Sequence, residues 1–160
     1  MTELLHPDDL IRRLKLNRYR CFIITGRPGT GKSRLARAMA ARTGGQYLDL
    51  MATFAADVQL AANLDTFTPR RFKDWLRPYY GPTLVLLDEM EFLWHRWDDA
   101  EKQEFLTILA RMPKAAFFGA FLPPHPLIEN FEMLDQDGRP RIFALREMKS
   151  VDSRTVDGSR

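Results

Sequence analysis

The sequence has only one cysteine, few histidines and no long hydrophobic run. Its only cysteine, Cys21, cannot form a disulfide within the chain, and in an apolar stretch it is expected to behave as a small buried residue. One cysteine and three scattered histidines do not form a zinc-binding pattern. Prolines interrupt the most apolar stretch, 115–128, and the N-terminus does not have the pattern of a signal peptide. We therefore expect a cytoplasmic protein with no membrane segment.

Neither sign of charge dominates. The 24 Lys and Arg residues nearly match the 21 Asp and Glu residues, so the net charge of +3 permits a nucleic-acid partner without indicating one. A chain of 160 residues with 45% hydrophobic and 28% charged content is typical of one globular domain. We expect a single core over 1–148, with an N-terminal helix within 1–18, and a flexible tail over 149–160.

Residues 26–33 match the phosphate-binding loop G-x-x-x-x-G-K-[ST] at every fixed position. The glycines at 26, 29 and 31 allow successive backbone N–H groups to point at phosphates, next to the positive end of a helix dipole. Lys32 is expected to reach the β- and γ-phosphates, and the Ser33 hydroxyl to coordinate Mg²⁺. The residues predicted to bind the nucleotide are Gly26, Arg27, Pro28, Gly29, Thr30, Gly31, Lys32, Ser33 and Arg34.

Hydrophobic periodicity predicts that strands and helices alternate along the chain. Strands are expected at 21–24, 46–50, 83–89, 115–120 and 141–145. Helices are expected at 6–16, 33–43, 53–64, 68–77, 98–112 and 126–134. Alternation of this kind predicts an α/β fold with a mostly parallel, five-stranded sheet covered by helices on both faces. Ligands of such sheets bind beyond the carboxyl ends of the strands.

The predicted strand 83–89 contains four consecutive large apolar residues and ends in two carboxylates. Asp88, at the strand end, can hold Mg²⁺ together with Ser33. Glu89, pointing to the opposite side of an extended strand, can polarise a water for attack on the γ-phosphate. We therefore expect Lys32 and Glu89 as catalytic residues, and Ser33 and Asp88 as metal ligands.

The phosphate loop and the apolar run ending in Asp88 and Glu89 resemble the AAA+ and related P-loop ATPases over about residues 19–145. The resemblance implies a three-layer P-loop NTPase fold with strand order 5-1-4-3-2, an ATP and Mg²⁺ site, and assembly into rings or filaments. In such assemblies a neighbouring subunit supplies an arginine, for which Arg139 and Arg141 are the candidates; a surface role beside the preceding turn is equally compatible with the sequence.

Two features differ from that family's pattern. The end of the fourth predicted strand, 118–121, lacks the Asn or Thr that usually senses the γ-phosphate, and we expect no C-terminal helical lid domain. Hydrolysis by the chain alone is therefore expected to be slow, with activation by self-association or a partner.

The small size and the Asp-Glu pair also resemble the small P-loop protein of BREX-type bacteriophage-defence systems. This resemblance implies an accessory ATPase in a bacterial cytoplasm that works with larger proteins of a defence complex and with DNA.

Two other functions are compatible with the phosphate loop. A small-molecule or nucleoside kinase would use Asp49 to orient an acceptor hydroxyl and the arginines at 70, 71 and 77 to clamp phosphates, but it does not need the Asp-Glu pair. An ATP-gated assembly module without hydrolysis is favoured by the missing sensor. The segment 92–97, with two tryptophans around His95 and Arg96, is interpreted as core packing in preference to a surface that binds a partner or stacks bases.

Overall fold

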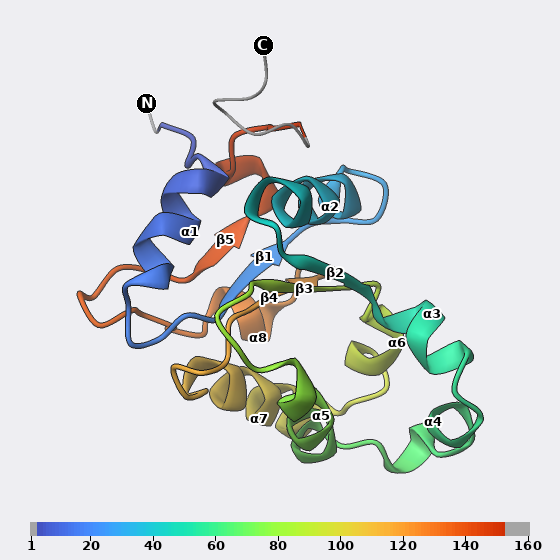
Figure 1. Cartoon of the computed structure of the whole chain (residues 1–160). Coiled ribbons are helices and arrows are strands. Elements are labelled where there is room, and N and C mark those ends of the chain that lie inside the picture. Colours follow the sequence, from blue (N-terminus) through green and yellow to red (C-terminus); the bar gives the residue numbers. More distant parts are fainter. Residues whose placement is uncertain (1–2, 153–160) are drawn as a thin grey trace.

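The computed structural model describes residues 3–152, which form an α/β fold around one five-stranded sheet (Figure 1). The strands are β1 (Phe22–Thr25), β2 (Gln46–Asp49), β3 (Val85–Asp88), β4 (Phe118–Leu122) and β5 (Ile142–Ala144). All neighbouring strands are parallel, in the order β2-β3-β4-β1-β5. The prediction of a mostly parallel sheet is confirmed, and from the other edge the order is the 5-1-4-3-2 that the resemblance implies.

Helices lie on both faces of the sheet because adjacent strand residues point to opposite faces and both faces are apolar. One face is covered by α1 (Pro7–Lys15) and α2 (Lys32–Thr43) (Figure 1). Phe22, Ile24 and Leu86 pack against residues of these helices. Their neighbours Ile23 and Leu87 face a second cluster on the other side. That cluster includes residues of α5 (Pro69–Leu76), α6 (Glu91–Trp94), α7 (Asp99–Ala110) and α8 (Pro126–Glu129).

Capping residues marked two helix starts correctly. Thr68 accepts a hydrogen bond from the N–H of Arg71 at 3.2 Å and begins α5, with a proline in its first turn. Asp98 and Glu101 form the reciprocal capping box of α7, with hydrogen bonds of 2.8 and 3.0 Å. Both signals depend only on residues three apart, so the sequence alone was sufficient to find them.

Other element bounds differ from prediction. The single helix expected over 53–64 is two helices, α3 (Leu50–Ala55) and α4 (Val58–Ala62), because Asp57 caps the second through the N–H groups of Gln59 and Leu60. β4 begins later and ends later than predicted, and α8 stops at Glu129 instead of 134. Short 3₁₀ segments complete the chain at η1 (Leu64–Thr66), η2 (Arg77–Tyr79) and η3 (Leu145–Glu147).

The two ends of the described region are joined to each other and to α2. Leu5 and Met148 form a parallel bridge, and the Lys149 N–H donates to the Leu5 carbonyl at 2.7 Å. Arg42 donates to the main-chain oxygen of Asp152 at 3.3 Å. Lys149 and Asp152, which fall within the tail predicted over 149–160, are thus bonded to the domain. Residues 153–160 lie outside the described residues.

The tryptophans of the segment 92–97 belong to the core, as predicted. Trp94 is fully buried, and Trp97 is buried with its indole N–H donating to the Phe67 carbonyl at 2.9 Å. Both rings contact Phe105. Cys21 is buried as well, and burial raises the pKa of its thiol to about 12, so it acts as an apolar residue. Within residues 3–152, no helix combines the length and the apolar character needed to cross a membrane.

Candidate functional site

The loop 26–31 connects β1 to α2 at the carboxyl end of the sheet. Gly29 and Gly31 have φ angles of +79° and +103°, in the left-handed region that only glycine adopts without strain. No atom lies within 4 Å of a Cβ built on either residue, so the space beside them is open. Gly31 directly precedes Lys32, the first residue of α2. Gly29 and Gly31 thus have backbone conformations that favour glycine, next to a helix N-terminus.

Lys32 is held by a carboxylate that the sequence analysis did not select. Its side chain is only 6% exposed, and its ammonium forms an ion pair with Glu91, the first residue of α6. Glu91 lies between the Asp88-Glu89 pair and the segment 92–97, and the sequence analysis gave it no role. A phosphate bound in the loop would compete with Glu91 for the same ammonium group.

The structure brings Ser33, Asp88 and Glu89 together from α2 and the end of β3. The Ser33 hydroxyl donates to Glu89 Oε2 at 3.2 Å. Asp88 is 1% exposed, and its Oδ2 accepts a hydrogen bond from the Tyr47 hydroxyl at 2.7 Å. Its other oxygen, Oδ1, is buried without a hydrogen-bond partner. A buried carboxylate oxygen without a donor is costly, so Asp88 fits the role of a cation ligand.

Glu89 has a left-handed backbone, with φ of 55°, the only positive value at a non-glycine position within residues 3–152. This conformation costs about 1–2 kcal/mol for a residue with a Cβ. The expectation that Asp88 and Glu89 occupy opposite sides of one extended strand was wrong, because β3 ends at Asp88 and the chain turns at Glu89. The turn allows the Glu89 carboxylate to reach Ser33.

Tyr47 is a second site residue that the sequence analysis missed. It lies on the edge strand β2, in register with Leu86, two residue pairs before the pair of Asp49 and Asp88. Burial, followed by the hydrogen bond with Asp88, raises the pKa of its phenol above the usual range, so the hydroxyl remains a neutral donor at neutral pH. A correct strand order does not give the register, and without the register nothing marks this tyrosine.

Arg141 is a structural residue, and its assignment as a trans arginine is corrected. It is 2% exposed, and its guanidinium donates to the carbonyls of Cys21, Ala110 and Leu134 at 2.8–2.9 Å. A buried guanidinium that donates to three main-chain carbonyls does not extend to a neighbouring subunit. Arg139 is 54% exposed and contacts Asp137 on the surface, so it alone remains a candidate.

The segment that follows β4 is also placed differently from the prediction. Residues 118–121 lie buried within the strand, which ends at Leu122 in register with Thr25. The positions directly beyond the strand are therefore 123–125, two prolines and a histidine, which again include neither Asn nor Thr. His125 Nδ1 accepts from the N–H of Leu127 at 3.0 Å and caps α8.

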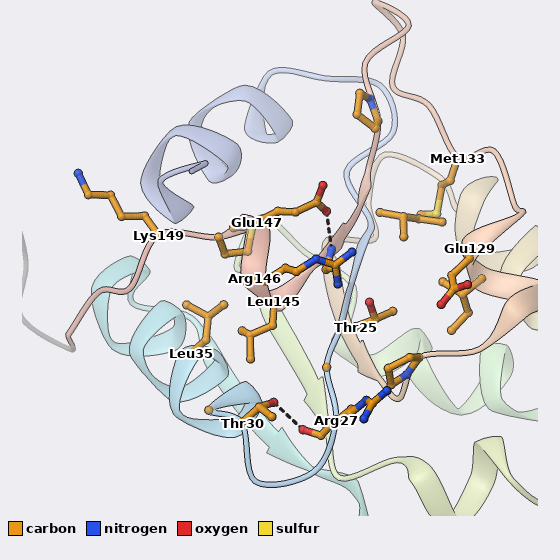
Figure 2. Close-up of a pocket in the computed structure, with 18 of the residues that line it drawn as sticks. Thr25, Arg27, Thr30, Leu35, Glu129, Met133, Leu145, Arg146, Glu147 and Lys149 are labelled. Atoms are coloured by element: carbon orange, nitrogen blue, oxygen red, sulfur yellow. Dashed lines mark hydrogen bonds between the residues drawn. The ribbon is translucent and has the colours of Figure 1, made fainter. Parts of the chain in front are cut away.

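A pocket of about 1060 Å³ opens beside the phosphate loop (Figure 2). The loop and α2 provide one wall, with Arg27, Thr30 and Leu35, and η3 provides Leu145 and Arg146. The Thr30 hydroxyl donates to the Arg27 carbonyl at 2.6 Å across the loop. Lys32 does not line this pocket, and neither does the carboxylate cluster of Asp88 and Glu89 at the end of β3.

Three of the residues considered for a kinase make other contacts in the structure. Asp49 Oδ1 accepts from the Ala52 N–H at 3.0 Å and caps α3. Arg71 donates to the Thr66 hydroxyl, and Arg77 pairs with Asp74 on the surface. None of these side chains lines the pocket.

Comparisons with known proteins found no match to the sequence, either among family models or among curated proteins. Within residues 3–152, no group of three or more His, Cys, Asp or Glu side chains is placed to hold a metal by itself.

Proposed function

We propose that this chain binds ATP with Mg²⁺ and hydrolyses it, as a P-loop NTPase of the AAA+ type with the three-layer arrangement of that class. The observation that carries the proposal is the meeting of two separate sequence signals. The glycine-dependent loop 26–31 leads into α2, and Ser33 of that helix reaches the carboxylate cluster at the end of β3. In that cluster, the buried Asp88 has one oxygen without a partner.

Each residue of the site has a role in this proposal. The loop N–H groups and Lys32 bind the phosphates, while Ser33 and Asp88 hold Mg²⁺, which commonly takes one or two carboxylates together with substrate phosphates. Bound Mg²⁺ would neutralise charge that develops on the phosphate oxygens. Glu89 orients the attacking water and accepts its proton. The pocket beside the loop, with apolar walls from Leu35 and Leu145, is the proposed place of the nucleoside.

We further propose that turnover by the chain alone is slow and rises on self-association or on contact with a partner. The absence of Asn and Thr directly beyond β4 and the exposure of Arg139 support this view. Partners from a phage-defence complex, an action with DNA and a cytoplasmic location rest on the sequence resemblances and composition.

The test is an assay of the wild-type chain with ATP and Mg²⁺. Phosphate release is measured with and without duplex DNA, ATP consumption with and without a panel of acceptors, and sedimentation with and without ATP. We expect phosphate release with water as the acceptor and an ATP-dependent change in sedimentation. Consumption of ATP only in the presence of an acceptor would indicate a kinase. Tight binding of ATP without release of phosphate would indicate an ATP-gated module. Absence of ATP binding would contradict all three functions.

Glu91→Gln is expected to increase the affinity for ATP by about tenfold, because the bound phosphates no longer compete with a full carboxylate for Lys32. The substitution keeps the size of the side chain. Titration with a fluorescent ATP analogue measures the change. Glu104→Gln is the matched control, since it removes the same charge from α7, a helix that supplies none of the proposed site residues. Equal affinities of Glu91→Gln and the wild type would show that this ion pair does not oppose nucleotide binding.

A further inference from the structure

The hydroxyl of Tyr47 makes the single hydrogen bond that the Asp88 carboxylate receives among the described residues. The two side chains come from neighbouring strands, and Asp88 is 1% exposed. Because a neutral phenol can only donate to a carboxylate, the contact fixes which oxygen is occupied, Oδ2, and which is left over, Oδ1.

We propose that Tyr47 is a positioning residue of the Mg²⁺ site: its hydroxyl holds Oδ2 of Asp88 so that Oδ1 is the oxygen presented to the cation. This inference rests on the proposed function, in which Asp88 and Ser33 are the metal ligands. It assigns to an edge-strand tyrosine a role that the phosphate-loop and Asp-Glu motifs do not include.

The placement of Tyr47 supports a role beyond packing. The guanidinium of Arg37 lies over the Tyr47 ring, 4.8 Å from its centroid. Arg37 follows Ser33 by four residues on α2, which places the two on the same side of the helix. Helix α2 therefore carries Ser33, one proposed metal ligand, and also supports Tyr47, which orients the other ligand, Asp88. Through Tyr47, the position of the Asp88 carboxylate is coupled to that of Ser33.

Residues that hydrogen-bond a metal-binding side chain orient it, and their loss commonly reduces metal affinity by about 10–100-fold. Tyr47→Phe removes the hydroxyl and keeps the ring under Arg37. Without that donor, both oxygens of a buried carboxylate lack a partner, so Asp88 is free to adopt other orientations. The defect is expected in cation binding and not in the contacts of the loop with phosphate.

The experiment measures binding of a fluorescent, non-hydrolysable ATP analogue over a series of Mg²⁺ concentrations and in EDTA. For Tyr47→Phe we expect an affinity in EDTA within about twofold of the wild type, and a half-saturating Mg²⁺ concentration raised about 10–100-fold. Asp88→Asn provides the reference for loss of the ligand. Tyr79→Phe is the matched control, because Tyr79 lies in η2, outside the site, where its ring packs against Trp75 of α5.

Three distinguishable results would overturn the inference. An unchanged half-saturating Mg²⁺ concentration in Tyr47→Phe would show that the Tyr47 hydroxyl does not position Asp88. An equal loss of affinity in EDTA and in Mg²⁺ would show a general structural role. If the wild type itself shows no nucleotide binding or no Mg²⁺ dependence, the proposed function fails and the inference fails with it.

Discussion

Lys32→Ala is expected to abolish ATP binding, with a loss of affinity of at least about 100-fold. The substitution removes the charge that would contact the terminal phosphates, and charge-assisted hydrogen bonds of this kind are worth about 1.5–3 kcal/mol each. It also leaves the Glu91 carboxylate without its cation, next to the position proposed for the phosphates. The lost attraction and the new repulsion both lower the affinity for ATP. We therefore expect this loss of affinity to be the largest among the variants.

Titration with a fluorescent ATP analogue measures the loss, and thermal unfolding shows whether the variant is folded. Lys15→Ala, at the exposed end of α1, removes the same charge outside the site and should bind like the wild type. The double variant Lys32→Ala with Glu91→Gln separates the two contributions, because it should recover the part caused by repulsion. A folded Lys32→Ala variant with wild-type affinity would contradict the phosphate-site assignment.

Glu89→Gln is expected to reduce phosphate release by about 10²–10⁴-fold while ATP binding is preserved. The amide has the size of the carboxylate and can still accept from the Ser33 hydroxyl, so the contacts around the loop persist. The amide cannot take a proton from the attacking water, so the loss of activity should occur at that step. Binding and phosphate release are measured on the same preparation, so that the two effects can be compared directly.

Glu104→Gln again serves as the control for the loss of one carboxylate, and its turnover should match the wild type. Turnover of Glu89→Gln equal to that of the wild type would remove Glu89 from the catalytic mechanism. A parallel loss of binding and turnover would instead indicate that Glu89 supports the loop through Ser33.

Features set by neighbouring residues were predictable from the sequence. The apolar run, the glycines and the helix of 21–43 follow one another directly, and the structure places β1, the loop and α2 there. The helix start at Asp98 was equally local. The helix break at Asp57 was also a local signal, but the hydrophobic pattern across 53–64 concealed it, because an aspartate inside such a pattern is compatible with both one helix and two.

Features set by tertiary contacts were not predictable in the same way. Tyr47 contacts Asp88 because β2 lies in a particular register beside β3, and Glu91 contacts Lys32 because α6 starts close to it. Arg141 was expected at the surface because it is charged and follows a turn. It is instead buried, and its guanidinium supplies the donors for three main-chain carbonyls from different parts of the chain.

The left-handed backbone at Glu89 has an evolutionary consequence. Glycine would adopt this conformation without the penalty of a Cβ, so selection for stability alone favours losing the carboxylate at this position. A lineage that uses the domain only as a scaffold would gain stability by drifting to glycine, whereas a lineage that needs the acid must tolerate a less stable turn. The residue found at position 89 in related chains would therefore indicate which of them still depend on the chemistry of this site.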